Sequence, residues 1–169
     1  MESDALRAVL LGIALLAFAI YLGGAVSMEL MLRFAQEDLP GPQTAITCKV
    51  SGDLWKWIAL VSLSATGLSV AVMLFLRSPM LPSGWYALAV GGFGASWIAL
   101  MSILVKMSFR AHPALAFRPD PSMPPEEFAE TRQALKRAIR RMDLLLRTEL
   151  GIAIFMGACL SVIADLAMQ

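Results

Sequence analysis

Sulfur-bearing side chains are the residues of this sequence whose types and spacing could bind a metal. The chain of 169 residues contains 11 methionines, two cysteines and a single histidine. Met28 and Met31 are three residues apart, and Met101 and Met107 lie in a second apolar stretch. Because thioethers are soft ligands that favour Cu(I), these four methionines are candidate copper ligands. Methionine at helical spacing is more often apolar packing, which is the alternative interpretation.

The sequence contains no motif for other catalytic or cofactor chemistry. The only histidine is His112, so a haem with two histidine ligands cannot form within one chain. Neither a P-loop nor a GxSxG, HExxH or Rossmann motif occurs. Cys48 and Cys159 fit neither a CxxC motif nor a disulfide framework, and we expect two free thiols. The sequence therefore predicts a protein that is not an enzyme and has no cofactor, with copper as the alternative.

The elements that must position these residues are four apolar stretches. The sequence is 58% hydrophobic and 16% charged, with a mean hydropathy of +0.69, whereas a soluble domain carries about 25% charged residues. The predicted spans are residues 8–30, 57–76, 85–107 and 149–168, each close to the roughly 20 residues that cross a bilayer core. We expect one all-α domain over residues 1–169, an integral membrane four-helix up-down bundle. Residues 31–56 and 108–148 are predicted to be its cytoplasmic loops.

The distribution of lysine and arginine predicts the orientation of the chain. Arg7 and Arg77 are the only basic residues of the N-terminus and the second connection. The other 12 lie on the opposite side: Arg33, Lys49, Lys56, Lys106, Arg110, Arg118, Arg132, Lys136, Arg137, Arg140, Arg141 and Arg147. By the positive-inside rule, both termini are expected to be periplasmic, in a bacterial inner membrane.

The last 46 residues, 124–169, are predicted to form one long helix, because no proline follows Pro125. Its second half is a membrane span, and its first half is amphipathic and basic, a cytoplasmic extension of that span. The basic side chains are Arg132, Lys136, Arg137, Arg140 and Arg141. Such a surface binds anionic lipid headgroups or a partner protein, or is simply solvated. Without interleaved aromatic residues, it is a poor surface for nucleic acid.

Small residues at intervals of four predict where the helices pack closely, since close approach is the main source of helix association in lipid. The candidate packing residues are Gly23, Ser27, Gly67, Ala87, Gly91, Ala95, Ala153, Gly157 and Ser161. Aromatic residues add a second expectation. Trp55, Trp57, Trp85 and Tyr86 border the spans and are predicted to lie at the membrane interface, whereas Tyr21 and Trp97 are predicted to pack inside.

Three ionisable residues fall at one depth of the predicted bundle, close to its cytoplasmic side. Glu29 lies near the end of the first span, and Arg147 and Glu149 lie at the start of the fourth. Charged residues in a membrane need partners, so we expect an ion pair between Glu29 and Arg147, with Glu149 beside it. A structural pair that fixes helix register and a transport or proton path are both open.

Several short patches resemble the bacterial copper-resistance D family of four-helix inner-membrane proteins. In the first span Gly23 and Gly24 match that family's Gly-Gly, and Tyr21 stands at its Trp position. Thr66-Gly67 and the segment from Arg147 to Gly151 are similar to two further motifs. Ala14 stands where the family has a histidine, and the third span has no lysine where one is expected, so the resemblance implies a degenerate branch that kept the bundle. It also implies copper transport or resistance as one activity.

These observations favour a non-catalytic inner-membrane protein that acts by packing against other membrane subunits. The leading hypothesis is an accessory or structural subunit of a larger bacterial membrane complex, such as a respiratory or photosynthetic assembly. The first alternative is copper handling through methionine ligands. The second is a haem-linked four-helix membrane oxidase. The expected partners are the lipid bilayer and other membrane protein subunits.

Overall fold

Four long helices make up the described part of the chain. The structure is a computed structural model and describes residues 2–39, 41–76, 84–108 and 124–168. The helices are α1 (Glu2–Asp38), α2 (Gly41–Phe75), α3 (Trp85–Lys106) and α5 (Pro125–Met168), with no strand in these ranges. Each is long and apolar enough to cross a membrane. The predictions of an all-helical fold and of four membrane-length helices are therefore confirmed.

The connection between α1 and α2 is much shorter than the predicted loop at residues 31–56. Helix α1 continues to Asp38 and α2 begins at Gly41, so most of the expected loop is helical. The buried Thr44 hydroxyl donates hydrogen bonds to the carbonyl oxygens of Ala35 (2.9 Å) and Leu39 (3.1 Å). The Ala35 carbonyl also accepts the Leu39 N–H at 3.2 Å, so Thr44 adds a second bond there and supplies a donor to the Leu39 carbonyl just beyond the helix end. Apolar periodicity extends past both predicted spans, since Ala35 and Cys48 are also buried, and this packing explains the longer helices.

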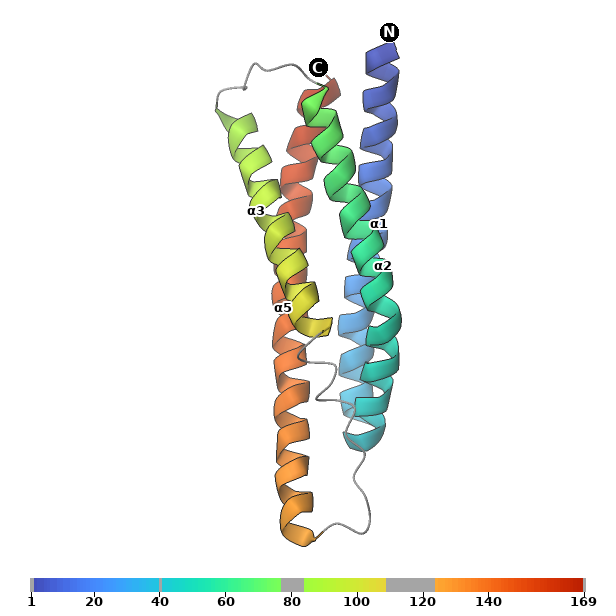
Figure 1. The fold of residues 1–169 in the computed structure, drawn as a ribbon, viewed down its shortest axis with the longest axis vertical. Helices are drawn as coiled ribbons and strands as arrows, with labels where there is room; N and C mark the ends of the chain where they lie inside the picture. The colour runs from blue at the N-terminus through green and yellow to red at the C-terminus, as the bar shows by residue number, and fades with distance from the viewer. Residues whose placement is uncertain (1, 40, 77–83, 109–123, 169) are drawn as a thin grey trace.

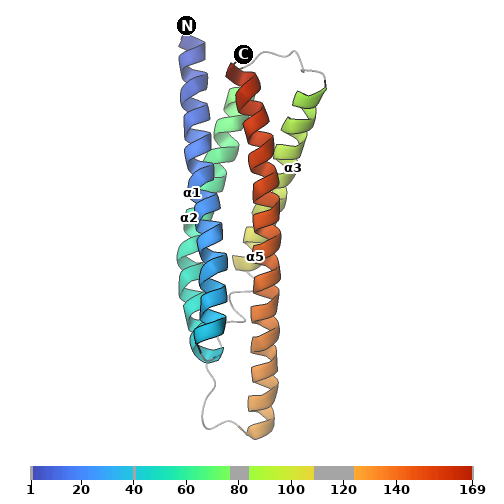
Figure 2. The ribbon, with the colours of Figure 1, turned by 180° about the vertical axis from the view of Figure 1, so that it is seen from behind.

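The helices lie antiparallel to their neighbours along the chain (Figure 1). Helix α1 packs along α2, α5 packs along α3, and α1 also contacts α5, which joins the two pairs. Figure 2, from behind, shows α1 and α5 side by side at the joining seam. Contacts between α2 and α3 are far fewer. The packing is therefore continuous from α2 through α1 and α5 to α3, and loose where α2 faces α3.

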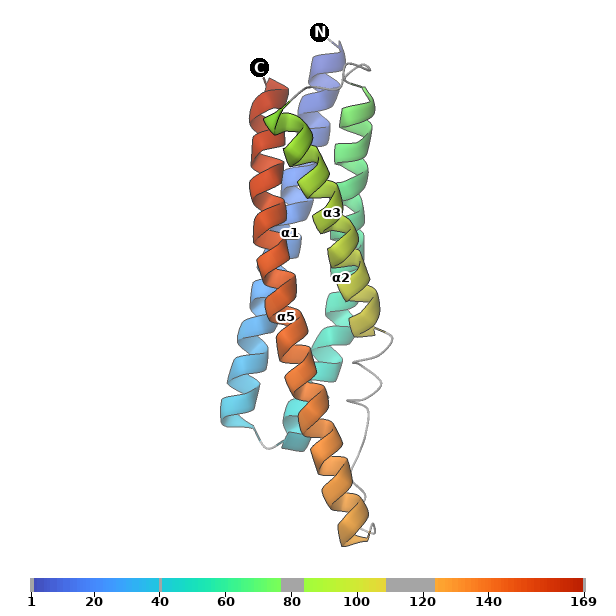
Figure 3. The same ribbon diagram turned by 90° about the vertical axis from the view of Figure 1, so that its left-hand side faces the viewer.

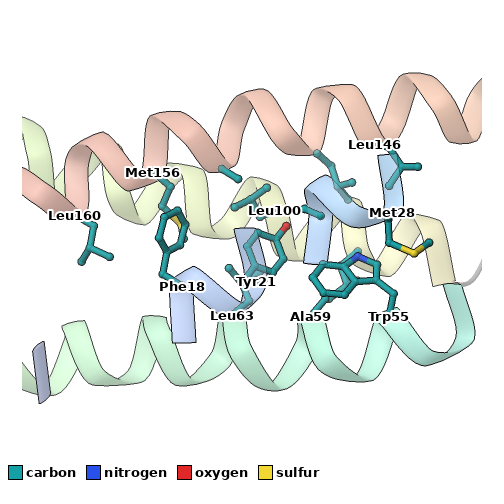
Figure 4. Packing of buried hydrophobic residues seen from close by; sticks show 14 of the residues in the cluster. Phe18, Tyr21, Met28, Trp55, Ala59, Leu63, Leu100, Leu146, Met156 and Leu160 are labelled. Atoms are coloured by element: carbon teal, nitrogen blue, oxygen red, sulfur yellow. The ribbon is translucent and has the colours of Figure 1, made fainter. Parts of the chain in front are cut away.

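The interior is filled by apolar side chains from all four helices (Figure 4). Its centre includes Phe18, Tyr21, Leu63, Leu100, Met156 and Leu160. Large apolar side chains also cover the outside: Leu16, Val61, Leu68, Ile98 and Ile154 are all at least 60% exposed. Because outer and inner faces are both apolar, the helices suit a lipid environment on one side and a packed core on the other. The molecule is thus a multi-pass membrane protein.

Helix α5 is the longest element and extends past the α1–α2 turn (Figures 1 and 3). Its 44 residues correspond to about 66 Å, twice the roughly 30 Å core of a bilayer. Glu126 and Glu127 lie in its first turn, where their charges complement the helix dipole. Further along, one face is buried, and the basic side chains exposed on the other are Arg132, Lys136, Arg137, Arg140 and Arg141.

Candidate functional site

A polar cluster lies inside the helices where α1, α2 and α5 meet. The Tyr21 hydroxyl on α1 donates a hydrogen bond of 2.6 Å to Oε1 of Glu149 on α5. Both residues are fully buried, at 0% exposure. A hydrogen bond between residues 128 positions apart connects the first and last helices at one depth. Tyr21 therefore packs inside the protein, as predicted, and also carries the polar group that reaches Glu149.

Trp55 completes the cluster from α2. Its ring stacks on Tyr21, with ring centroids 5.7 Å apart and planes at 28°. Gly24, one turn from Tyr21, makes room for this ring, because a Cβ there would overlap Trp55. Trp55 is only 5% exposed, so its ring packs between the helices, and its place at the membrane interface stays a prediction. Trp57, 63% exposed with the Lys56 ammonium 5.7 Å from its ring centroid, and Trp85, 83% exposed, are the outward-facing tryptophans.

Two polar atoms of this cluster have no hydrogen-bond partner among the described residues. They are Oε2 of Glu149 and Nε1 of Trp55, both buried. An unsatisfied buried polar atom is costly and uncommon, and it needs an explanation where it occurs. The cluster thus has one donor and one carboxyl oxygen free for other chemistry.

A separate ionic cluster surrounds Glu29 on α1. Arg33 donates two hydrogen bonds to Glu29 Oε1, at 2.8 and 3.0 Å, and Arg147 Nε approaches the same oxygen at 3.6 Å. Arg147 is also paired with Asp143, 3.1 Å away. Glu29 and Arg147 do meet, but the closest partner of Glu29 is Arg33. The i,i+4 spacings of Glu29 to Arg33 and Asp143 to Arg147 contain this information, which the sequence analysis missed.

Glu149 takes no part in that ionic cluster, although it was expected beside Arg147. Two residues along a helix correspond to a rotation of about 200°, so Arg147 and Glu149 point to opposite sides of α5. Arg147 is exposed, whereas Glu149 faces the interior. The carboxyl groups of Glu29 and Glu149, which were predicted to lie side by side, therefore belong to two separate clusters.

Four sulfur-containing residues line a small cavity of about 10 Å³ between α1, α2 and α5. Met28, Met31, Cys48 and Met142 line it together with Leu32, Ser51 and Leu146. The Ser51 hydroxyl lies 2.8 Å from the sulfur of Met31. Cys48 and Met142 were not among the predicted copper ligands, because only the folded chain brings α2 and α5 to α1 here. Of the other two candidates, Met101 lines a different groove, and the buried Met107 lines neither cavity.

That groove, of about 590 Å³, separates α2 from α3. It is lined by Ser64, Gly67, Leu68, Val70, Ala71 and Leu74 of α2 and by Val90, Phe93, Gly94, Trp97 and Met101 of α3. The Trp97 indole N–H donates a hydrogen bond of 2.8 Å to the Leu63 carbonyl oxygen. Gly67 allows the Trp97 ring to approach α2 closely. Trp97 therefore spans the gap between the two helices, while the rest of the groove stays open.

The predicted small-residue packing stripes coincide only in part with the observed contacts. Gly67, Ala153 and Gly157 do lie in packed positions, with Gly157 against Phe18. The exposed members are Gly23, Ser27, Ala87, Gly91, Ala95 and Ser161. On α1 and α3 the packed glycines are the next residues, Gly24 and Gly92. A shift of one residue turns a helix by about 100°. The side chains that face the packed glycines, Trp55 and Cys159, lie on other helices.

The ligand and cysteine predictions can be located as well. Cys48 and Cys159 are both free and buried. Among the described residues, no three His, Cys, Asp or Glu side chains are grouped as a metal site, and His112 lies outside those residues. Comparisons with protein-family models, curated proteins and solved structures find no match. The fold and the site therefore define a class only, that of a four-span membrane protein with a buried polar cluster.

Proposed function

We propose that this protein is a non-catalytic accessory subunit of a larger complex in a bacterial inner membrane, and that a partner's transmembrane helix packs in the α2–α3 groove. The carrying observation is this groove of about 590 Å³, which has an almost wholly apolar lining. It lies between α2 and α3, which have far fewer contacts with each other than α1 has with α2 or α3 has with α5. Protein interiors are close-packed with few voids, so an apolar gap of this size between two helices is a place where another helix can pack.

The chemistry of the groove suits a helix better than a polar ligand. Gly67, Ala71 and Gly94 are among its lining residues, and small side chains permit the close backbone approach on which helix association in lipid depends. The Trp97 N–H is already bonded to Leu63, so the groove presents no indole donor that a ligand must satisfy. Ala87, Gly91 and Ala95, exposed on the neighbouring stripe of α3, enlarge the surface that a helix can approach.

The basic face of α5 supplies a second contact in this proposal. With both termini periplasmic, the extension of α5 projects into the cytoplasm, where Arg132, Lys136, Arg137, Arg140 and Arg141 meet acidic partner residues or anionic headgroups. These five side chains add charge complementarity to an apolar contact made within the membrane.

Photocrosslinking in native membranes tests the groove. A photoreactive residue at Leu68, in the groove and 67% exposed, is expected to give one discrete protein adduct. The matched control is Leu16 on α1, 65% exposed but outside the groove, which is expected to crosslink to lipid only. Similar adducts from both positions, or none from Leu68, would contradict the proposal.

A groove-filling variant gives the complementary test. A Cβ on Gly94 would meet no atom within 4 Å, so Gly94→Leu adds a side chain to the groove from an open position. Native mass spectrometry after gentle extraction is expected to show partner subunits bound to the unmodified chain and lost from this variant. Gly23→Leu, at an equally open position on α1, is the control and should retain them.

The sulfur cluster favours copper handling as a second candidate function. Three thioethers and one thiol from three helices line the cavity of about 10 Å³, and a soft monovalent ion such as Cu(I) prefers this donor set. Cys48 and Met142 are 6% and 1% exposed, so little solvent would compete for a bound ion.

Cu(I) titration of the purified chain under reducing conditions tests this candidate. One ion per chain is expected, and Cys48→Ser or Met142→Leu should abolish stoichiometric binding. Cys159→Ser and Met73→Leu are the matched controls, because both residues are buried but outside the cavity. Copper retained by the Cys48 and Met142 variants, or lost equally from the controls, would rule the cluster out as the site.

A further inference from the structure

The Glu149 carboxyl is buried in the interior without a compensating positive charge. It is fully buried, and its single hydrogen bond comes from a neutral hydroxyl, that of Tyr21. Its second oxygen, Oε2, is buried and unpartnered among the described residues. A polar group in this position is expensive in water-soluble proteins, and lipid offers even fewer ways to satisfy it.

The basic groups on the surrounding helices are paired elsewhere or exposed, as Lys49 of α2 is. On α1, Arg33 bonds to Glu29, and on α5 Arg147 pairs with Asp143 and approaches Glu29. On α2, Lys56 pairs with Asp53 at 3.2 Å and lies over the Trp57 ring. The basic residue of α3 in the described region is Lys106, which is exposed at the end of the helix.

The ionised and the protonated forms of the Glu149 carboxyl need different partners in this site. An ionised carboxylate here would be a buried charge stabilised by one hydroxyl, which is far too little to offset its loss of hydration. A neutral acid needs no counter-ion, and its carbonyl oxygen can accept the Tyr21 hydrogen bond. Since the Tyr21 hydroxyl already contacts Oε1, the acid proton belongs on Oε2, the atom without another partner.

From this geometry we propose that Glu149 is a proton-binding site inside the membrane, with its proton on Oε2 and its carbonyl oxygen, Oε1, held by Tyr21. The site is distinct from the ionic cluster of Glu29, whose carboxylate has two arginines around it. It does not depend on the accessory role or on copper, because none of its residues lines the α2–α3 groove or the sulfur cavity. The buried Tyr21–Glu149 pair thus binds one ligand, a single proton.

Infrared spectroscopy of the chain in phosphatidylcholine vesicles at neutral pH measures this proton directly. Exposed Asp and Glu side chains are ionised under these conditions. We expect a C=O stretching band of a protonated carboxylic acid that shifts when the chain is made with ¹³C-glutamate. The band should be lost in Glu149→Gln and kept in Glu29→Gln. A native chain without the band, or a band lost only in Glu29→Gln, would overturn the proposal.

A milder variant keeps the test decisive if Glu149→Gln does not fold. Tyr21→Phe removes only the hydroxyl, so the carbonyl of the acid loses its hydrogen bond and its band is expected at higher wavenumber. Tyr86→Phe removes the other tyrosine hydroxyl of the chain and should leave the band in place. A glutamate band that does not respond to Tyr21→Phe, or that responds equally to Tyr86→Phe, would show that the proton lies on another carboxyl.

Discussion

The α1–α2–α5 interior and the α2–α3 side of the same molecule differ in how closely their helices pack. In the interior, Gly24 receives Trp55, Trp55 stacks on Tyr21, and Tyr21 bonds to Glu149, so each contact depends on the next. Between α2 and α3, the Trp97 hydrogen bond bridges a groove of about 590 Å³. Hydrophobicity does not explain the difference, because both regions belong to helices that are long and apolar enough to cross a membrane. The difference shows that helix length and hydrophobicity determine where a helix resides, whereas individual side chains determine how closely two helices pack.

The largest expected effect comes from adding a side chain where the interior has no space. Gly24→Val forces the Trp55 ring away from Tyr21, and overpacking of this kind costs about 1–3 kcal/mol of stability. Gly23→Val is the matched control, because a Cβ at Gly23 meets no atom within 4 Å. Thermal unfolding in detergent should show a large loss for the first variant and little change for the second. Equal losses would mean that Gly24 and Gly23 are not on different faces of α1.

The prediction of the helices succeeded because it rests on properties of single segments. Hydropathy and length are sufficient to place four membrane-length helices, and the run of residues after Pro125 correctly indicated one uninterrupted helix. Helix ends were harder to predict. Near the end of α1, the Thr44 hydroxyl of α2 bonds to the carbonyl oxygens of Ala35 and Leu39, and a hydropathy window does not detect such a contact.

The site was only partly predictable, because its contacts join residues that are far apart in sequence. Tyr21 and Trp97 were predicted to pack inside. The packing of Trp55 against Gly24 was not predicted. Glu149 and Arg147 are neighbours in the sequence, but helix rotation sends them to opposite sides of α5. Cys48 and Met142 joined Met28 and Met31 only through the packing of three helices. In each case the missing information was the rotation of one helix relative to another.

A smaller effect is expected from removing the hydrogen bond of the interior while keeping its shape. Tyr21→Phe retains the ring that stacks on Trp55 but leaves both oxygens of Glu149 without a donor. The expected loss is about 1 kcal/mol, the usual net value of one hydrogen bond. The double variant Tyr21→Phe, Glu149→Gln should lose less unfolding free energy than the two single variants lose together, because both substitutions remove the same hydrogen bond. Fully additive losses in unfolding experiments would show that the two residues do not interact.

The smallest effect is expected at Glu29, although it is nearly as buried as Glu149. Its partners Arg33 and Arg147 have side chains that are 55% and 57% exposed, so solvent screens the ion pairs and each contributes at most about 1 kcal/mol. Glu29→Gln should therefore lower the unfolding temperature slightly, and raising the salt concentration should reduce the difference from the unmodified chain. Tyr21→Phe serves as the comparison, because a neutral, fully buried hydrogen bond does not respond to salt in this way. A salt-independent loss at Glu29 would show that its carboxylate acts as a buried group, like Glu149, and would remove the distinction between the two carboxyls.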